Sequence, residues 1–316
     1  MQRILPRGEI EALDHNVIPR LVAPQAAEVF RARAARLRQL AEDSPIADYL
    51  RLIATLSDAQ HNALKAFTPP EVDDARVDLA QTHGMPPLQA GALARHPAWR
   101  GLLLQLLDHL QATPGLPPAA AEICARLRAQ ATDDTAALEA QADVLLGHGN
   151  GDVDVATAPF LMAALQVYWT AMACRFDEAR LPVVSPFGVC PVCGGLPVAS
   201  LIRVGGQHAG YRYLCCSLCA TQWHVVRVKC TTCESTEGIA YQSLEGEGRT
   251  ALDAAAKAET CDHCHTYRKI FSQEKDLNVD PVADDLATLD LDVLVGEAGY
   301  QRASGNPFLW QGGQED

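Results

Sequence analysis

The sequence predicts an α+β multidomain protein, with an all-α helical domain at residues 1–180, two small rubredoxin-like or zinc-ribbon β modules at 186–229 and 230–275, and a C-terminal helix with a docked tail at 280–316. Three observations predict this fold class. The first part shows helical apolar periodicity, short β-branched runs follow between Gly-rich and Cys-rich turns, and nine of the eleven cysteines lie between 190 and 264. A chain of 316 residues also exceeds one typical core, which favours several domains.

The first helix signals are a cap and an apolar face. Ser44 and Pro45 suit an N-cap and a first helical position, and apolar residues then recur at helical spacing. The face consists of Ile46, Tyr49, Leu50, Ile53 and Leu56. Further helices are expected around 24–43, 97–113, 118–130, 132–146 and 156–178, separated by Pro pairs and Gly-rich turns.

The arginines of the first predicted helix spread around its circumference, because successive side chains are rotated by about 100°. They therefore predict a solvated surface and not a basic binding stripe. These residues are Arg31, Arg33, Arg36 and Arg38.

One uncharged stretch, 155–174, has the length of a membrane span. Ala, Thr, Gln166 and Pro159 dilute its hydrophobicity, so a buried core helix is predicted and no stable membrane insertion. The first residues, MQRILPRGEIEALDHN, carry charges where a signal peptide needs an apolar core. A cytoplasmic location is expected.

Beyond residue 180 the pattern changes to strands. Short β-branched and aromatic runs predict strands at 197–204, 221–228 and 238–244, forming small hairpins. Asp280 and Pro281 begin a last helix. The final segment holds Tyr300, Phe308, Leu309 and Trp310, and it is apolar enough to dock on the body of the protein or on a partner.

Four CxxC pairs are the candidate metal ligands of this sequence. Two intervening residues let both sulfurs face one ion, and backbone N–H groups of the turn can bond to the thiolates. There are 22 residues between the first two pairs, 27 between the last two and 10 between the halves, which suggests a duplicated unit. Pairing first with second and third with fourth gives two tetrahedral sites, and an interleaved pairing is the alternative. The ligands would be Cys190, Cys193, Cys216 and Cys219 in one site, and Cys230, Cys233, Cys261 and Cys264 in the other.

The remaining cysteines fall outside these two ligand sets. Cys215 and Cys216 are adjacent, so in an extended segment only one of them faces the ion, and Cys216 keeps the CxxC spacing. Cys124 and Cys174 fall in helical segments and suit small core positions. CDHCH at 261–265 matches the haem-attachment pattern, but using it for haem would leave Cys230 and Cys233 without a role.

All-thiolate tetrahedral sites suit zinc or a single iron. Because protein ligands fill every position, metal-centred hydrolysis is not expected, and a structural or electron-transfer role remains. HExxH, GxSxG and GxGxxG motifs are absent from the sequence. We predict no catalytic residues and no cofactor besides the metals, so the chain is not expected to be an enzyme.

The net charge of -13 and the pI near 5.2 argue against general nucleic-acid binding. Residues 179–233, however, contain no Asp or Glu. Their cations could offset the charge of the thiolates or form a docking face, and a zinc-ribbon nucleic-acid module is a weaker third hypothesis. The cations are Arg180, Arg203, Arg212, Arg227 and Lys229.

Several stretches together resemble the formate dehydrogenase accessory protein family, FdhE, and the resemblance covers nearly the whole chain. They are CPVCGGLPVAS, RYLCCSLCATQWHVVRVKCTTC, CDHCHTYRKI, the tail pattern ADDLATLDLD, GY and NPFL, and RARAARLRQLAEDSPIADYL in the helical first half. The resemblance implies a cytoplasmic maturation factor that binds the catalytic subunit of respiratory formate dehydrogenase before its twin-arginine export. It also implies two rubredoxin-type iron ions on the eight cysteines, with zinc as the alternative.

Two rival functions remain open, an electron-transfer protein with rubredoxin-like iron and a zinc-ribbon interaction module. The sequence is also compatible with a homodimer. Cys215 departs slightly from the family pattern, which leaves its role open.

Overall fold

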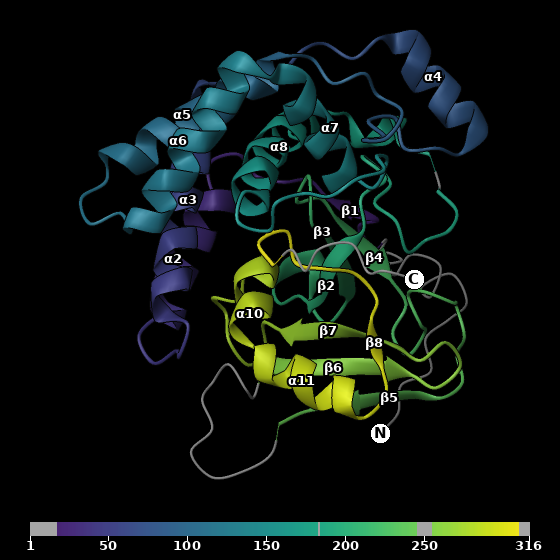
Figure 1. The fold of residues 1–316 in the computed structure, drawn as a ribbon. Coiled ribbons are helices and arrows are strands. Elements are labelled where there is room, and N and C mark those ends of the chain that lie inside the picture. The colour runs from purple at the N-terminus through teal and green to yellow at the C-terminus, as the bar shows by residue number, and fades with distance from the viewer. Residues whose placement is uncertain (1–17, 183, 245–254, 310–316) are drawn as a thin grey trace, which may run out of the picture.

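The computed structural model describes residues 18–182, 184–244 and 255–309. Within them, a group of helices packs against a mixed sheet that carries two four-cysteine clusters, which confirms the predicted fold class (Figure 1). The helices are α2 (Val29–Leu40), α3 (Ala47–Ala66), α4 (Asp74–His83), α5 (Ala98–Ala112), α6 (Pro118–Asp133), α7 (Thr135–Leu145), α8 (Ala158–Ala173), α10 (Pro281–Ala287) and α11 (Leu289–Glu297). The strands are β1 (Leu21–Val22), β2 (Pro197–Ile202), β3 (Arg212–Cys216), β4 (Gln222–Val225), β5 (Ile239–Gln242), β6 (Ala256–Cys261), β7 (Thr266–Ser272) and β8 (Gln301–Arg302).

Helix α8 is the centre of the helical part. All of its residues are buried, so the uncharged stretch forms the predicted core helix. One of its polar side chains is satisfied by the loop between α4 and α5, since Trp169 Nε1 donates to the Leu88 carbonyl over 3.1 Å. In the described part of the chain, no helix combines the length and the hydrophobicity that a membrane crossing requires.

Helix α2 corrects one expectation. Arg33 and Arg36 are buried instead of solvated, because α10 packs on this side of α2 and supplies carboxylates. Arg36 Nη2 lies 2.6 Å from Asp284, and Arg33 Nε lies 3.3 Å from Asp280. Only Arg31 and Arg38 remain on the surface with half of their side chains exposed. The two buried arginines thus join the helical part to the C-terminal helix.

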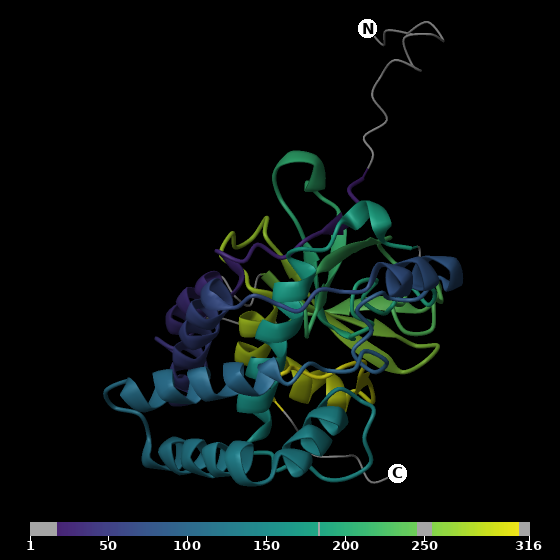
Figure 2. The same cartoon turned by 90° about the horizontal axis from the view of Figure 1, so that it is seen from above.

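Helix α4 was not predicted. It begins where the Asp73 carboxylate accepts the Ala75 N–H over 3.0 Å, and it ends at Gly84, whose φ of 62° is the left-handed value common after a helix. It buries only Val77 and Ala80, so its apolar face is too short to give a clear periodic signal. In both views it stands away from α2 and α3 (Figures 1 and 2).

The strands of the two predicted ribbons join in one sheet. Its order is β1-β4-β3-β2-β7-β6-β5, and β8 pairs with β7. The ribbons meet where β2 and β7 run parallel, with Leu201 opposite Phe271. A buried ion pair also joins them, since Arg212 Nη2 lies 2.6 Å from Glu259. The predicted strands correspond to β2, β4 and β5, and the proposed domain boundaries stay predictions.

The C-terminal helix differs from the single one expected, because it is broken at Thr288 between α10 and α11. Lys269 Nζ donates to the carbonyls of Asp285 and Thr288 over 2.9 and 2.8 Å. These carbonyls therefore accept hydrogen bonds from a buried ammonium. In a continuous helix they would accept from the backbone N–H groups of the next turn. The break lets α11 pack on β6 and β8 while α10 packs on β2 and β7.

The tail docks on the body, as the apolar sequence predicted. Phe308 is buried, and its carbonyl accepts a hydrogen bond from the Tyr49 hydroxyl. Asn306 Nδ2 donates to the Val282 carbonyl over 2.9 Å. Trp310 lies outside the described residues.

Candidate metal centres

Each of the four CxxC pairs forms a tight turn of the same kind. The residue after the second cysteine has a positive φ in all four: Gly194 (73°), Ala220 (59°), Glu234 (65°) and His265 (52°). This left-handed residue turns the chain, and in three of the turns its N–H bonds back to the carbonyl of the first cysteine. The distances are 2.8 Å at Cys190, 3.2 Å at Cys230 and 2.9 Å at Cys261. We call these turns knuckles.

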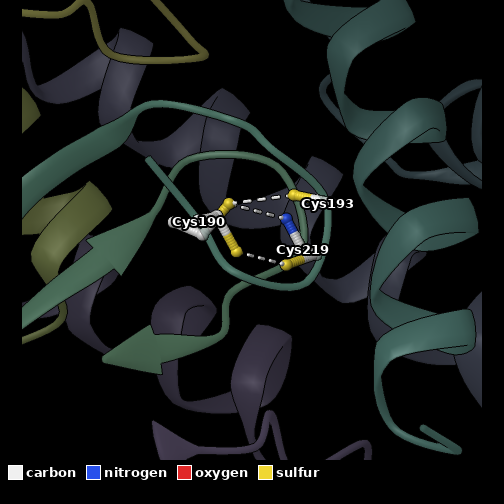
Figure 3. Close-up of side chains that lie close together, drawn as sticks. Cys190, Cys193 and Cys219 are labelled. Carbon is white, nitrogen blue, oxygen red and sulfur yellow. Dashed lines mark hydrogen bonds between the residues drawn. The ribbon is translucent and has the colours of Figure 1, made fainter. Parts of the chain in front are cut away.

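The first cluster consists of Cys190, Cys193, Cys216 and Cys219, as the sequence predicted. The Sγ atoms of Cys190 and Cys219 are 3.6 Å apart, and those of Cys193 and Cys216 are 3.4 Å apart. Figure 3 shows the side chains of Cys190, Cys193 and Cys219 pointing toward one another. All four residues are buried, with at most 2% exposure.

The second cluster consists of Cys230, Cys233, Cys261 and Cys264. The Sγ separations are 3.6 Å between Cys230 and Cys264 and 3.7 Å between Cys233 and Cys261. Cys233 and Cys264 are partly exposed, unlike any ligand of the first cluster. In each cluster all four sulfurs lie within 4.8 Å of one another, so the structure groups them as predicted and not in the interleaved order.

Both clusters fit a tetrahedral metal ion. Sulfurs placed about 2.3 Å from a central ion would be separated by about 3.8 Å, and the paired Sγ atoms lie 3.4 to 3.7 Å apart. Backbone N–H groups also point at the sulfurs: Leu218 and Cys219 donate to Cys216 Sγ over 3.4 Å. In the second cluster, Thr232 N–H donates to Cys230 Sγ over 3.4 Å. Each cluster could hold one ion through four thiolates, leaving no position for substrate.

Burial opposes ionisation of the thiols in the first cluster. It raises the pKa of Cys190 and of Cys193 well above the usual value for a thiol. Burial also opposes ionisation of Cys219, but hydrogen bonding with the neighbouring thiols and with Thr221 holds its pKa below the usual value. Four thiolates therefore form together only when a bound cation offsets their charge.

The second cluster has two further supporting groups. Although burial opposes it, hydrogen bonding to Thr266 lowers the pKa of Cys264 to about 7. Arg268 is buried, and its Nε donates to Thr231 Oγ1 inside the Cys230 knuckle over 3.0 Å. Burial and the cations of Arg212 and Arg302 lower the pKa of Arg268 to about 9. Among the described residues, Arg268 forms no ion pair with a carboxylate. The negative charge of the nearby thiolates would therefore stabilise the positive charge of its guanidinium.

These supporting residues were not predicted, although the sequence holds a signal for two of them. Thr221 and Thr266 occupy the same place, two residues after the second cysteine of a CxxC pair, and their Oγ1 atoms lie 3.2 Å from Cys219 Sγ and 3.1 Å from Cys264 Sγ. Gly195 was also missed. A Cβ there would lie 3.3 Å from the sulfurs of both Cys193 and Cys216.

The cations of residues 179–233 are largely engaged inside the chain. Arg180 pairs with Asp74 and Asp78, Arg212 with Glu259, and Lys229 with Glu234. Arg203 donates to the Gln222 side chain, and Arg227 donates to the Gly210 carbonyl. Contacts within the chain therefore explain most of these cations, and no docking partner is needed to explain them.

The other cysteines lie outside both clusters. Cys215 is buried on strand β3, and burial raises the pKa of its thiol. Cys124 is a core residue, as expected. Cys174 is half-buried and bonds to the Pro24 carbonyl, with an Sγ to oxygen distance of 3.2 Å.

Comparison with known families matches nearly all of the described residues to one family. The model of the FdhE N-terminal domain matches residues 18–185, that of the FdhE central domain matches 189–227, and that of the FdhE C-terminal domain matches 228–309. The boundary at 227/228 falls between the two clusters.

Curated relatives match at full length. The chain is 42% identical to the FdhE homologue of Cronobacter sakazakii over 315 residues and 41% identical to protein FdhE of Escherichia coli K12, with 98% of each chain covered. It also resembles the crystal structure of the FdhE protein from Pseudomonas aeruginosa. That match has a TM-score of 0.81 and 38% identity, and it covers 93% of this chain and 100% of the other.

Proposed function

As the chain belongs to the FdhE family, we propose that it is a cytoplasmic maturation factor that binds the catalytic subunit of a respiratory formate dehydrogenase before its twin-arginine export. The strongest support for this proposed function is similarity over the full length, because the helical part, the ribbons and the tail all match relatives named FdhE. The similarity is therefore not confined to the ribbons that carry the cysteines.

The two clusters are proposed to bind one rubredoxin-type iron each, with zinc as the alternative. Four thiolates from two knuckles suit either ion. The ligands are Cys190, Cys193, Cys216 and Cys219 in the first site and Cys230, Cys233, Cys261 and Cys264 in the second. Because protein fills every coordination position, the metals stabilise the ribbons or exchange electrons and do not hydrolyse a substrate. The chain is accordingly proposed to lack enzymatic activity.

The proposed client binding is tested by co-purification. A tagged chain is isolated anaerobically from cells that produce a respiratory formate dehydrogenase, and the bound proteins are identified by mass spectrometry. The catalytic subunit should be recovered, and an unrelated exported subunit with a twin-arginine signal should not. Recovery of neither, or of both equally, would contradict a dedicated role in formate dehydrogenase assembly.

One observation favours a second candidate function, electron transfer. Cys233 and Cys264 are partly exposed, so an ion in the second cluster would lie near the surface where a redox partner could approach. Iron-loaded protein would then show a visible charge-transfer band that dithionite bleaches reversibly. Stoichiometric zinc in the native protein would exclude this function, because zinc has no redox chemistry.

A further inference from the structure

Taking the proposed metal binding as given, we infer that the two clusters differ in metal exchange. The second cluster, Cys230, Cys233, Cys261 and Cys264, is the exchangeable site, and the first, Cys190, Cys193, Cys216 and Cys219, is a closed structural site. The duplicated spacing makes the sites look equivalent, but their surroundings differ.

The first cluster is fastened to the helical part at both of its knuckles. In the Cys190 knuckle, the carbonyls of Val192 and Cys193 accept the N–H groups of Leu88 and Ala90, each over 2.9 Å. In the Cys216 knuckle, Gln166 Nε2 of α8 donates to the Ser217 carbonyl over 2.6 Å. Opening this site would separate the knuckles from the helical core. The free energy of such an opening approaches that of global unfolding.

The first cluster is also buried, which agrees with its attachment to the helical part. Three of the four intervening residues, Pro191, Val192 and Leu218, are buried together with the four cysteines. A cavity of about 580 Å³ lies beside the site, bordered by the Cys193–Gly195 backbone and by the tail at Ser304 and Asn306. It gives no direct access to the ligands, because Cys193 remains fully buried.

The second cluster lies at the surface. Between its cysteines, Thr232, Asp262 and His263 are exposed, and two of its four ligands are partly exposed. The Cys261 knuckle is held at Asp262 by the Tyr300 hydroxyl, which donates over 2.6 Å in an exposed position. An exposed turn opens locally at lower cost than one packed against a helical core, so a competing ligand can replace one thiolate at a time.

This difference gives the two ions separate roles in the proposed maturation factor. The first ion holds the ribbon against α8 and keeps the fold together. The second ion is the one that responds to chelators, to oxidants and to a docked partner, because its ligands can be reached from solvent.

The test follows metal release from the full chain loaded with two equivalents of zinc under anaerobic conditions. Excess 4-(2-pyridylazo)resorcinol is added, and the coloured zinc complex is followed with time. Release should occur in two phases of one equivalent each, the faster at least roughly tenfold faster, since local opening costs less than opening against a packed core. Iodoacetamide added after the fast phase should modify the second cluster and leave the first protected, as read by peptide mass spectrometry.

Three cysteine substitutions, two in the second cluster and one in the first, assign the phases. Cys233→Ser should abolish the fast phase and keep the slow one, and Cys264→Ser should do the same. Cys193→Ser should keep the fast phase and lower the melting temperature. Simultaneous loss of both equivalents, or modification of the first cluster before the second, would overturn the inference. A wild-type chain that retains fewer than two equivalents would instead overturn the metal-binding proposal on which it rests.

Discussion

Asp285 shows how a buried charge can be stabilised in this fold. The residue is fully buried, and its carboxylate accepts from Arg302 and from Asn306 Nδ2, the latter over 2.8 Å. Lys269 Nζ lies 3.5 Å away. Burial alone would raise the pKa of Asp285, but these cations hold it below its usual value. The carboxylate is therefore charged, and its removal would leave buried cations short of a partner.

Asp285→Asn should lower the free energy of unfolding by roughly 3–5 kcal/mol, because it breaks a buried pair from one side. Urea denaturation of wild type and variant at neutral pH measures this. Asp48→Asn is the matched control, since Asp48 pairs with Arg51 at a side-chain exposure of 97% and should change stability by no more than about 0.5 kcal/mol. Equal effects of the two substitutions would contradict a stabilising role of the buried network.

The same carboxylate predicts a pH dependence. Its folded pKa is below the unfolded value of about 3.9, so its stabilising contribution is present above that value and is lost as the pH falls through the folded pKa. The difference in unfolding free energy between wild type and Asp285→Asn should therefore shrink at pH 3 relative to pH 7. A difference that stays constant or grows would contradict a charged Asp285.

Gly188 marks a close approach between the ribbons. A Cβ at this position would lie 2.3 Å from the carbonyl oxygen of Thr231, which lies in the Cys230 knuckle. Gly188→Ala should therefore force a backbone shift and destabilise the protein by about 1–3 kcal/mol. Gly101→Ala is the control, because nothing lies within 4 Å of its Cβ and alanine favours helix α5 by up to about 1 kcal/mol. Thermal unfolding of both variants compares them, and an unchanged Gly188→Ala melting temperature would contradict the close contact.

At the scale of elements, periodicity identified most helices and missed parts of the sheet. The predicted helix that begins at Ser44 has a clear apolar face, and it is present as α3. The predicted helix at 156–178 is apolar throughout, and it is present as α8. Strands β6 and β7 contain Glu259, Arg268 and Lys269, charged residues that a sequence pattern assigns to the surface. They are buried because distant partners such as Arg212 and Asp292 bond to them. Such pairings depend on tertiary structure, so one sequence gives no local sign of them.

The docked tail gives a prediction at the same scale. Phe308 is 1% exposed within the main hydrophobic core, far in sequence from the helices that it contacts. Phe308→Ala should cost about 3–5 kcal/mol of stability, as for other large core residues. Val293→Ala on α11 is the control, because Val293 is 59% exposed and should change stability by less than about 0.5 kcal/mol. Chemical denaturation distinguishes them, and a neutral Phe308→Ala would show that the tail is not part of the core.

At the scale of the whole molecule, the ribbons are less independent than their sequences suggest. The parallel pairing of β2 with β7 and the Arg212–Glu259 ion pair join them in one sheet, and Gln166 ties the Cys216 knuckle to α8. The eight candidate ligand cysteines follow from the CxxC spacing, because a CxxC turn is a local feature, whereas the structure decides between consecutive and interleaved grouping. The unequal burial of the two clusters and the position of Arg268 depend on how the domains pack, which spacing does not encode.

Each cluster is proposed to bind one metal ion, and metal quantification after anaerobic purification tests this most directly. Two ions per chain are expected for wild type and for Cys215→Ser, and one ion for Cys193→Ser and for Cys233→Ser. An absorbance spectrum of the same samples distinguishes iron from zinc. Fewer than two ions in the wild type, or loss of an ion in Cys215→Ser, would contradict the proposed ligand sets.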